Sequence, residues 1–198
     1  MGFKNGTDGN VGIAIDAIRS ASTSHHFLSV TKQGLSAIVA TAGNECCHLI
    51  LRGGAAGPNY SSSHIENYVA QLAKAGVCDR VMVDCSHGNS QKKHQNQILV
   101  ARDIVSQLSS PNSTTANKIF GVMIESHLFE GAQKLPLCGI KSLSELKYGV
   151  SVTDACLSFE DTVATLNELR QGVQQRRALN AKVNDFGAIE ESCVVDEF

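Results

Sequence analysis

The chain has 198 residues, of which 42% are hydrophobic and 18% charged, and its formal net charge is -2. This length suits one domain with a sizeable core, and the near-neutral charge gives no electrostatic basis for binding nucleic acid or an anionic membrane surface. No apolar run approaches the roughly 18 residues that a membrane span needs, and the N-terminal stretch MGFKNGTDG lacks the apolar centre of a signal peptide.

Short apolar runs recur along the chain and predict β-strands. They occupy residues 2–4, 48–52, 80–84 and 120–125, with a later run at 150–153. Because their hydrophobicity is continuous rather than alternating, they are typical of strands covered on both faces of a parallel sheet. Two further runs, 26–31 and 36–40, flank Gly34 and predict a β-hairpin.

Amphipathic patterns between these runs predict four helices. Apolar residues recur at helical spacing over residues 9–22, 62–75, 93–108 and 160–177. The alternation of strands and helices implies βα units and an α/β domain over residues 1–177. From about Ala178 the pattern is lost, so residues 178–198 are expected to form a flexible C-terminal tail. Residues 131–149, with Pro136 and Gly139, are expected to form mainly loop.

Ionisable residues follow the apolar runs. They are Lys4, Arg52, Asp84 with His87, Glu125 and Asp154. In parallel α/β folds, ligands gather at the carboxyl ends of the strands. Because these residues close successive segments, they are expected to converge on one site.

The residues of this expected site divide into two chemical groups. Lys4 and Arg52 are cations suited to phosphate or carboxylate. His87, Glu125 and Asp154 form a nitrogen and oxygen donor set suited to a divalent metal, Mn²⁺, Fe²⁺, Co²⁺ or Zn²⁺. A metal could polarise a carbonyl group while the cations hold an anionic substrate beside it.

Each of these residues taken singly also has a structural explanation. His87 could be a satisfied strand-end histidine, Glu125 or Asp154 a helix cap, and Arg52 a partner in a structural ion pair. Cys85 could be a nucleophile, but a small buried cysteine in the core is the simpler interpretation. Asp84, Ser86 and His87 are close in sequence, but this does not identify them as a Ser-His-Asp triad. A triad is defined by the contacts and roles of its side chains in the folded structure.

The chain has seven cysteines, an odd number, and their spacing is not that of a disulfide-bonded scaffold. This usage favours reduced thiols in a cytoplasmic protein.

Five motifs together resemble one enzyme family. They are GFKNGTDG (2–9), LILRGG (49–54), VMVDCSHGNS (81–90), GVMIESH (121–127) and KYGVSVTDAC (147–156). In this order and spacing they are similar to class I 3-deoxy-D-arabino-heptulosonate 7-phosphate (DAHP) synthase, a transferase also called phospho-2-dehydro-3-deoxyheptonate aldolase. The likeness runs from Gly2 to about Arg177.

The resemblance implies a fold, a reaction and residue roles. The reaction is the condensation of phosphoenolpyruvate with erythrose 4-phosphate, the first step of the shikimate pathway to chorismate and the aromatic amino acids. His87, Glu125 and Asp154 would bind the metal, with His87, Asp154 and Lys4 catalytic, and Lys4 and Arg52 would hold phosphoenolpyruvate. The predicted hairpin would help to bind an aromatic amino acid effector near Ser29, with phenylalanine favoured over tyrosine.

The resemblance covers only part of such an enzyme. A family member carries an N-terminal half before the KNGTDG motif, with a metal-binding Cys and further substrate-binding residues. The chain is therefore expected to form the C-terminal half of a (β/α)8 barrel, strands five to eight, with the hairpin inserted. Alone it should bind metal weakly, with three protein ligands, and turn over little.

An open half-barrel suggests a partner. Its unpaired sheet edges and apolar face should seek a second copy or the missing N-terminal half. The alternative interpretation is a non-catalytic binding or regulatory half-barrel that associates with full-length synthase or with itself.

Overall fold

The computed structural model describes residues 1–135 and 143–192, with side chains described for residues 1–135 and 144–182. Its centre is a four-stranded, fully parallel sheet in the order β1-β4-β5-β6. The strands are β1 (Gly2–Lys4), β4 (His48–Leu51), β5 (Val81–Asp84) and β6 (Ile119–Met123). The predicted parallel α/β sheet is confirmed.

The register of the sheet brings the carboxyl ends of its strands together. Lys4 lies opposite Ile50, Leu51 opposite Val83, and Asp84 opposite Met123. The loops that follow these residues therefore emerge at one edge of the sheet, as the carboxyl ends of parallel strands must.

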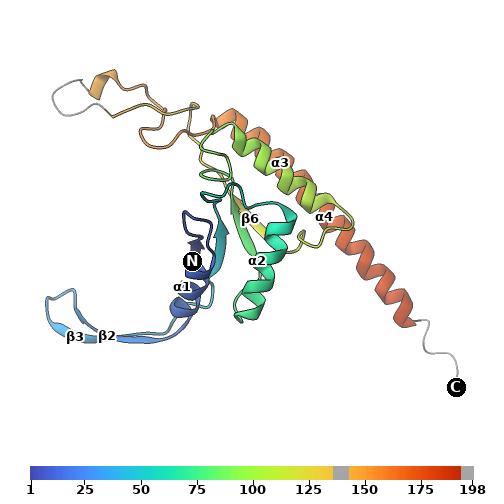
Figure 1. Ribbon diagram of the computed structural model, residues 1–198, viewed down its shortest axis with the longest axis horizontal. Helices are drawn as coiled ribbons and strands as arrows, with labels where there is room; N and C mark the ends of the chain where they lie inside the picture. Colours follow the sequence, from blue (N-terminus) through green and yellow to red (C-terminus); the bar gives the residue numbers. More distant parts are fainter. Residues whose placement is uncertain (136–142, 193–198) are drawn as a thin grey trace.

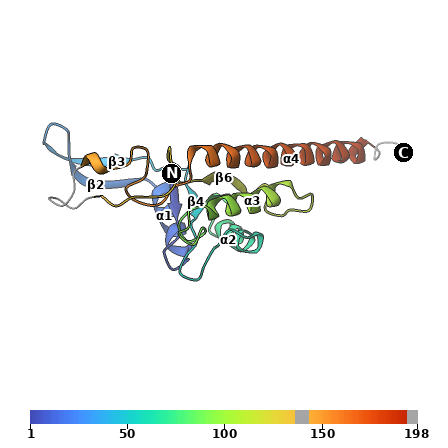
Figure 2. The ribbon, with the colours of Figure 1, turned by 90° about the horizontal axis from the view of Figure 1, so that it is seen from above.

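Four helices accompany the sheet (Figures 1 and 2). They are α1 (Gly12–Ser22), α2 (Ser62–Lys74), α3 (Asn96–Ser109) and α4 (Phe159–Ser192), and α3 runs alongside α4 in both views. The core is one apolar cluster of strand and helix side chains, among them the fully buried Leu49, Leu51, Ile65, Val83 and Ile104. No helix within the described residues has the length and apolar character needed to cross a membrane.

Helix α4 is longer than the sequence pattern predicts. The expected end at Arg177 is wrong, because the helix continues to Ser192 and projects beyond the body of the molecule (Figure 1). Residues 178–186 contain neither Gly nor Pro, so no helix breaker interrupts a run that includes good helix formers. The division into a domain over 1–177 and a flexible tail stays a prediction, and residues 193–198 lie outside the described part.

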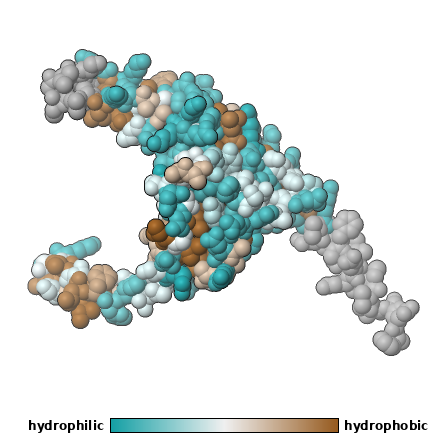
Figure 3. Space-filling model, in the orientation of Figure 1, coloured by the Kyte–Doolittle hydropathy of each residue, from teal (hydrophilic) through white to brown (hydrophobic). Residues whose placement is uncertain are grey.

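The predicted hairpin is confirmed as β2 (His25–Val30) and β3 (Ser36–Thr41). Gly34 has a φ of 81° in the connecting turn, a conformation that glycine adopts without steric cost. The hairpin projects from the body (Figure 1), and apolar side chains gather on it (Figure 3): Phe27, Leu28, Val30, Leu35 and Ile38 are exposed. An isolated two-stranded hairpin is marginally stable in water, so this one is expected to gain stability from a partner surface.

The run at 150–153 is not a strand of the central sheet, contrary to expectation. The backbone N–H of Thr153 donates to Ser151 Oγ, which folds the segment into a turn. Ser151 forms only an isolated bridge with Ala132, in the loop after β6. The turn nevertheless leaves Asp154 close to the carboxyl edge of the sheet.

Candidate metal and substrate site

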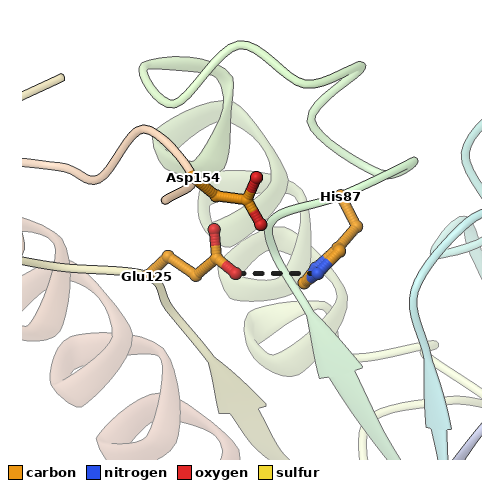
Figure 4. Close-up of side chains that lie close together, drawn as sticks. All are labelled: His87, Glu125 and Asp154. Atoms are coloured by element: carbon orange, nitrogen blue, oxygen red, sulfur yellow. Dashed lines mark ion pairs between the residues drawn. The ribbon is translucent and has the colours of Figure 1, made fainter. Parts of the chain in front are cut away.

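Three predicted residues come together at the carboxyl edge of the sheet (Figure 4). His87 follows β5, Glu125 follows β6, and Asp154 ends the turn at 151–154. One donor atom from each lies within 4.8 Å of the other two. Nε2 of His87 is 3.6 Å from Oε1 of Glu125. This nitrogen and oxygen set is a group that could hold a divalent metal ion.

The loop after β5 holds His87 in an uncommon backbone conformation. His87 has a φ of 55°, in the left-handed region that residues other than glycine rarely adopt. Asp84 Oδ1 accepts a hydrogen bond from the Ser86 backbone N–H at 2.9 Å and helps to set this turn. Such strain concentrates at functional sites and persists only where the surroundings enforce it.

Lys4 and His87 meet at Asp84, whose side chain is fully buried. Lys4 Nζ lies 2.7 Å from Asp84 Oδ2, and His87 Nδ1 lies 2.9 Å from the same oxygen. Despite this short distance, His87 Nδ1 is buried and makes no hydrogen bond within the described residues. Asp84 therefore links the predicted substrate-binding lysine to the predicted metal-binding histidine.

A pocket of about 290 Å³ opens beside the three clustered residues. Arg52, Lys92 and His94 contribute basic side chains to its wall, and all three clustered residues line it as well. Lys4 is not among the described residues that line it. His94 Nε2 also contacts Glu130 Oε2 at 3.1 Å. The arrangement can hold an anion next to a metal.

A buried group of asparagines fastens the loops beneath this site. Asn5, Asn59 and Asn89 are at most 4% exposed and bond to one another and to the backbone at the carboxyl ends of β4 and β5. The loops approach so closely that a Cβ on Gly53 would lie 2.5 Å from the backbone N of Asn89. The network keeps the backbone of Arg52 in place, since Asn5 Oδ1 accepts its N–H at 2.8 Å.

Comparison with known proteins assigns the chain to a family. The model of the DAHP synthetase I family matches residues 1–167. The chain belongs to the DAHP synthetase I family. The tyrosine-inhibited phospho-2-dehydro-3-deoxyheptonate aldolase of Schizosaccharomyces pombe is 50% identical over 185 residues, which are 93% of this chain and 48% of that protein.

Two further relatives agree with this assignment to the DAHP synthetase I family. The Phe-sensitive aldolase of Escherichia coli K12 is 49% identical over 177 residues, covering 89% of this chain and 48% of that protein. A solved structure of phospho-2-dehydro-3-deoxyheptonate aldolase from Francisella tularensis SCHU S4 superposes with a TM-score of 0.78 at 51% identity, covering 88% of this chain and 48% of that chain. The chain spans about half the length of the relatives it matches.

The predicted effector residue of this DAHP synthetase I chain lies apart from the cluster. Ser29 sits in β2 of the projecting hairpin, opposite Ala37 in β3. Its role stays a prediction.

Sequence reasoning missed Gln97 and the asparagines. Gln97 is fully buried and bonds to the backbone of Glu125. Its signal was a polar residue beside the apolar positions Ile98 and Val100 of an amphipathic helix. Asn5 and Asn89 lie one and two residues beyond Lys4 and His87, but nothing in the sequence pairs them with Asn59.

Cys85 is a core residue in this DAHP synthetase I chain. Burial, reinforced by the charge of Asp84, raises the pKa of its thiol to about 12. A raised pKa keeps the thiol neutral at all pH values below that range, and the thiolate is the reactive form. At pH 8 iodoacetamide should therefore modify the exposed Cys78 and leave Cys85 unmodified, as peptide mass spectrometry can measure. Equal labelling of both cysteines in the folded chain would contradict this assignment.

Proposed function

We propose that this chain supplies the metal-binding and phosphoenolpyruvate-binding part of a DAHP synthase, a transferase of the shikimate pathway. The reaction joins phosphoenolpyruvate to erythrose 4-phosphate and, with one water, gives DAHP and phosphate. The observation that carries the proposal is the approach of His87, Glu125 and Asp154 to one another beside a pocket with basic walls. Because the chain spans about half of its relatives' length, the substrates and the activity are themselves part of the proposal.

The donor set fits a divalent metal. An imidazole nitrogen and two carboxylates are ligands that Mn²⁺, Fe²⁺, Co²⁺ and Zn²⁺ share. His87, Glu125 and Asp154 would hold the ion, with their donor atoms already within 4.8 Å of one another. When bound, such an ion supplies Lewis acidity for the aldehyde carbonyl of erythrose 4-phosphate.

The basic residues would bind and orient phosphoenolpyruvate. The Arg52 guanidinium can bind a carboxylate or phosphate through two parallel hydrogen bonds. The Lys4 ammonium has three N–H donors, and the bond to Asp84 at 2.7 Å occupies one of them. The other two donors have no partner within the described part of the chain and could bind an anion, while Asp84 fixes the direction of the lysine.

The proposed chemistry requires three proton movements, of which residues of the site would carry out two. Carbon 3 of phosphoenolpyruvate bonds to the aldehyde carbon, and the aldehyde oxygen becomes a hydroxyl by taking up a proton. Water adds to carbon 2 of phosphoenolpyruvate, and the carbon–oxygen bond to phosphate breaks. The water oxygen becomes the ketone oxygen of DAHP by losing both of its protons, the first to a base of the site and the other to the leaving phosphate. We assign delivery of the hydroxyl proton to Lys4 and acceptance of the first water proton to Asp154, whose carboxylate is exposed toward the pocket.

The fold around this site is proposed to be the C-terminal half of a (β/α)8 barrel, strands five to eight. The other half would come from a further segment or another chain. An aromatic amino acid would bind near Ser29 on the hairpin, and the relatives that are named tyrosine-inhibited and Phe-sensitive support this class of effector.

Co-expression with the missing portion tests the function. The chain is combined with the segment of the E. coli relative that it does not match, and DAHP formation is measured with Mn²⁺ and both substrates. We expect activity in the purified complex and little in either part alone. A folded, metal-loaded complex that forms no DAHP would reject the catalytic proposal and favour a regulatory half-barrel.

A further inference from the structure

Gln97 makes two hydrogen bonds to the backbone of one residue. It lies in the first turn of α3 and is fully buried. Its Nε2 donates to the carbonyl oxygen of Glu125 at 3.1 Å, and its Oε1 accepts the backbone N–H of Glu125 at 2.8 Å. The orientation of the amide is fixed, because a backbone N–H can only donate and a carbonyl oxygen can only accept.

These bonds take the place of a backbone contact to β5, which Glu125 lacks within the described residues. Strand β6 ends at Met123, and the last backbone bond on the β5 side joins the Cys85 N–H to Met123 O at 2.8 Å. Glu125 lies two residues farther on. The side-chain amide of Gln97 presents a donor and an acceptor to it, as the peptide group of a neighbouring strand would.

The backbone position of Glu125 determines where its carboxylate can reach. The Leu157 N–H also donates to Glu125 O, at 3.0 Å. At the end of the Glu125 side chain, Oε2 accepts a hydrogen bond from Ser86 Oγ at 2.8 Å, while Oε1 faces His87. Gln97 does not line the pocket among the described residues, so it acts on the site only through Glu125.

We propose that Gln97 is a positioning residue that holds the backbone of Glu125 so that its carboxylate meets His87 and Asp154 at the metal. This inference rests on the proposed function, because it assigns a support to that same metal site. Hydrogen bonds behind a metal ligand fix its orientation, and their loss commonly weakens metal binding by roughly 10–100-fold.

Gln97→Met tests the proposal, since methionine keeps nearly the same length and volume but offers neither bond. The matched control is Gln107→Met on the same helix. Gln107 is half-buried and makes several hydrogen bonds, donating to Tyr60 O and accepting from Thr115 Oγ1, but it lies outside the site. A second variant, Gln97→Glu, keeps the acceptor for the Glu125 N–H and loses the amide donor.

Two readouts on the full chain separate positioning from a general loss of stability. Mn²⁺ affinity is measured by calorimetry, and the visible absorption of bound Co²⁺ reports ligand geometry. Both are recorded at a temperature where circular dichroism shows each variant folded. We expect Gln97→Met to bind Mn²⁺ about 10–100-fold more weakly with an altered Co²⁺ spectrum. Gln97→Glu should lose less affinity, and Gln107→Met should match wild type.

Three other results would contradict the proposal, and they can be told apart. If wild type binds both metals and folded Gln97→Met or Gln97→Glu binds equally well with an unchanged Co²⁺ spectrum, the positioning role is wrong while the proposed site stands. If Gln107→Met weakens binding as much as Gln97→Met, the effect is general destabilisation and the role is again rejected. If wild type itself binds neither metal, the proposed metal site fails and Gln97 loses its role with it.

Discussion

Replacing His87 with alanine is expected to lower the Mn²⁺ affinity of the chain at least about 100-fold, because even residues behind a metal ligand commonly contribute 10–100-fold. The substitution removes the only nitrogen donor among the three clustered side chains. It also leaves Glu125 and Asp154 facing each other without the imidazole, so the remaining site is anionic and has two ligands. Isothermal titration with Mn²⁺ measures the loss, and the reconstituted complex should lose DAHP formation in parallel.

The matched control for this substitution is His127→Ala. His127 lies two residues after Glu125 and is exposed, and its Nδ1 accepts the N–H of the adjacent Leu128 at 2.9 Å. It does not belong to the three-residue cluster. Its removal should change Mn²⁺ affinity by less than about threefold. A loss of Mn²⁺ affinity as large as that of His87→Ala would indicate that the metal binds somewhere other than at the proposed ligands.

Replacing Asn89 with alanine is expected to destabilise the chain by about 3–5 kcal/mol. Asn89 Nδ2 donates to Leu51 O and Asp84 O, and its Oδ1 accepts the Asn59 N–H, all within a buried site. Losing three buried hydrogen bonds at about 1 kcal/mol each, with partners that cannot reach water, is large against a typical total stability of about 5–15 kcal/mol. Urea denaturation followed by circular dichroism measures the change.

Asn180→Ala provides the comparison for this loss. Asn180 is exposed on α4 and makes a single side-chain bond, to Asn117 Oδ1 at 3.0 Å. Its replacement should cost less than about 0.5 kcal/mol, as surface substitutions usually do. If Asn89→Ala were as mild, the asparagine network would not be what secures the loops of the site.

Much of the framework could be predicted from the sequence because it depends on local patterns. Strands, helices and the hairpin at Gly34 follow from continuous apolar runs, helical periodicity and turn residues. The meeting of His87 and Glu125 follows from one topological rule, that residues after parallel strands share an edge. The rule does not cover Asp154, because the residues before it form a turn and not a strand of the sheet, although Asp154 still lies beside the other two.

The contacts that orient the site could not be predicted, because they depend on tertiary register. Lys4 and Asp84 lie on strands that are separated in the sheet by β4, so their pairing depends on how three strands align. Gln97 and Glu125 are 28 residues apart, and periodicity cannot reveal that an amide on a helix substitutes for a strand. Ile13 fits the apolar pattern of its helix but is 67% exposed, because amphipathic spacing does not show where coverage by neighbouring elements ends.

The most direct measurement of the central claim is a crystal structure of the chain with Mn²⁺, using anomalous scattering to locate the ion. The account predicts one anomalous peak at about 2.0–2.3 Å from a nitrogen of His87 and from carboxylate oxygens of Glu125 and Asp154. A peak at other side chains, or none in crystals grown at a Mn²⁺ concentration that saturates binding in solution, would contradict it.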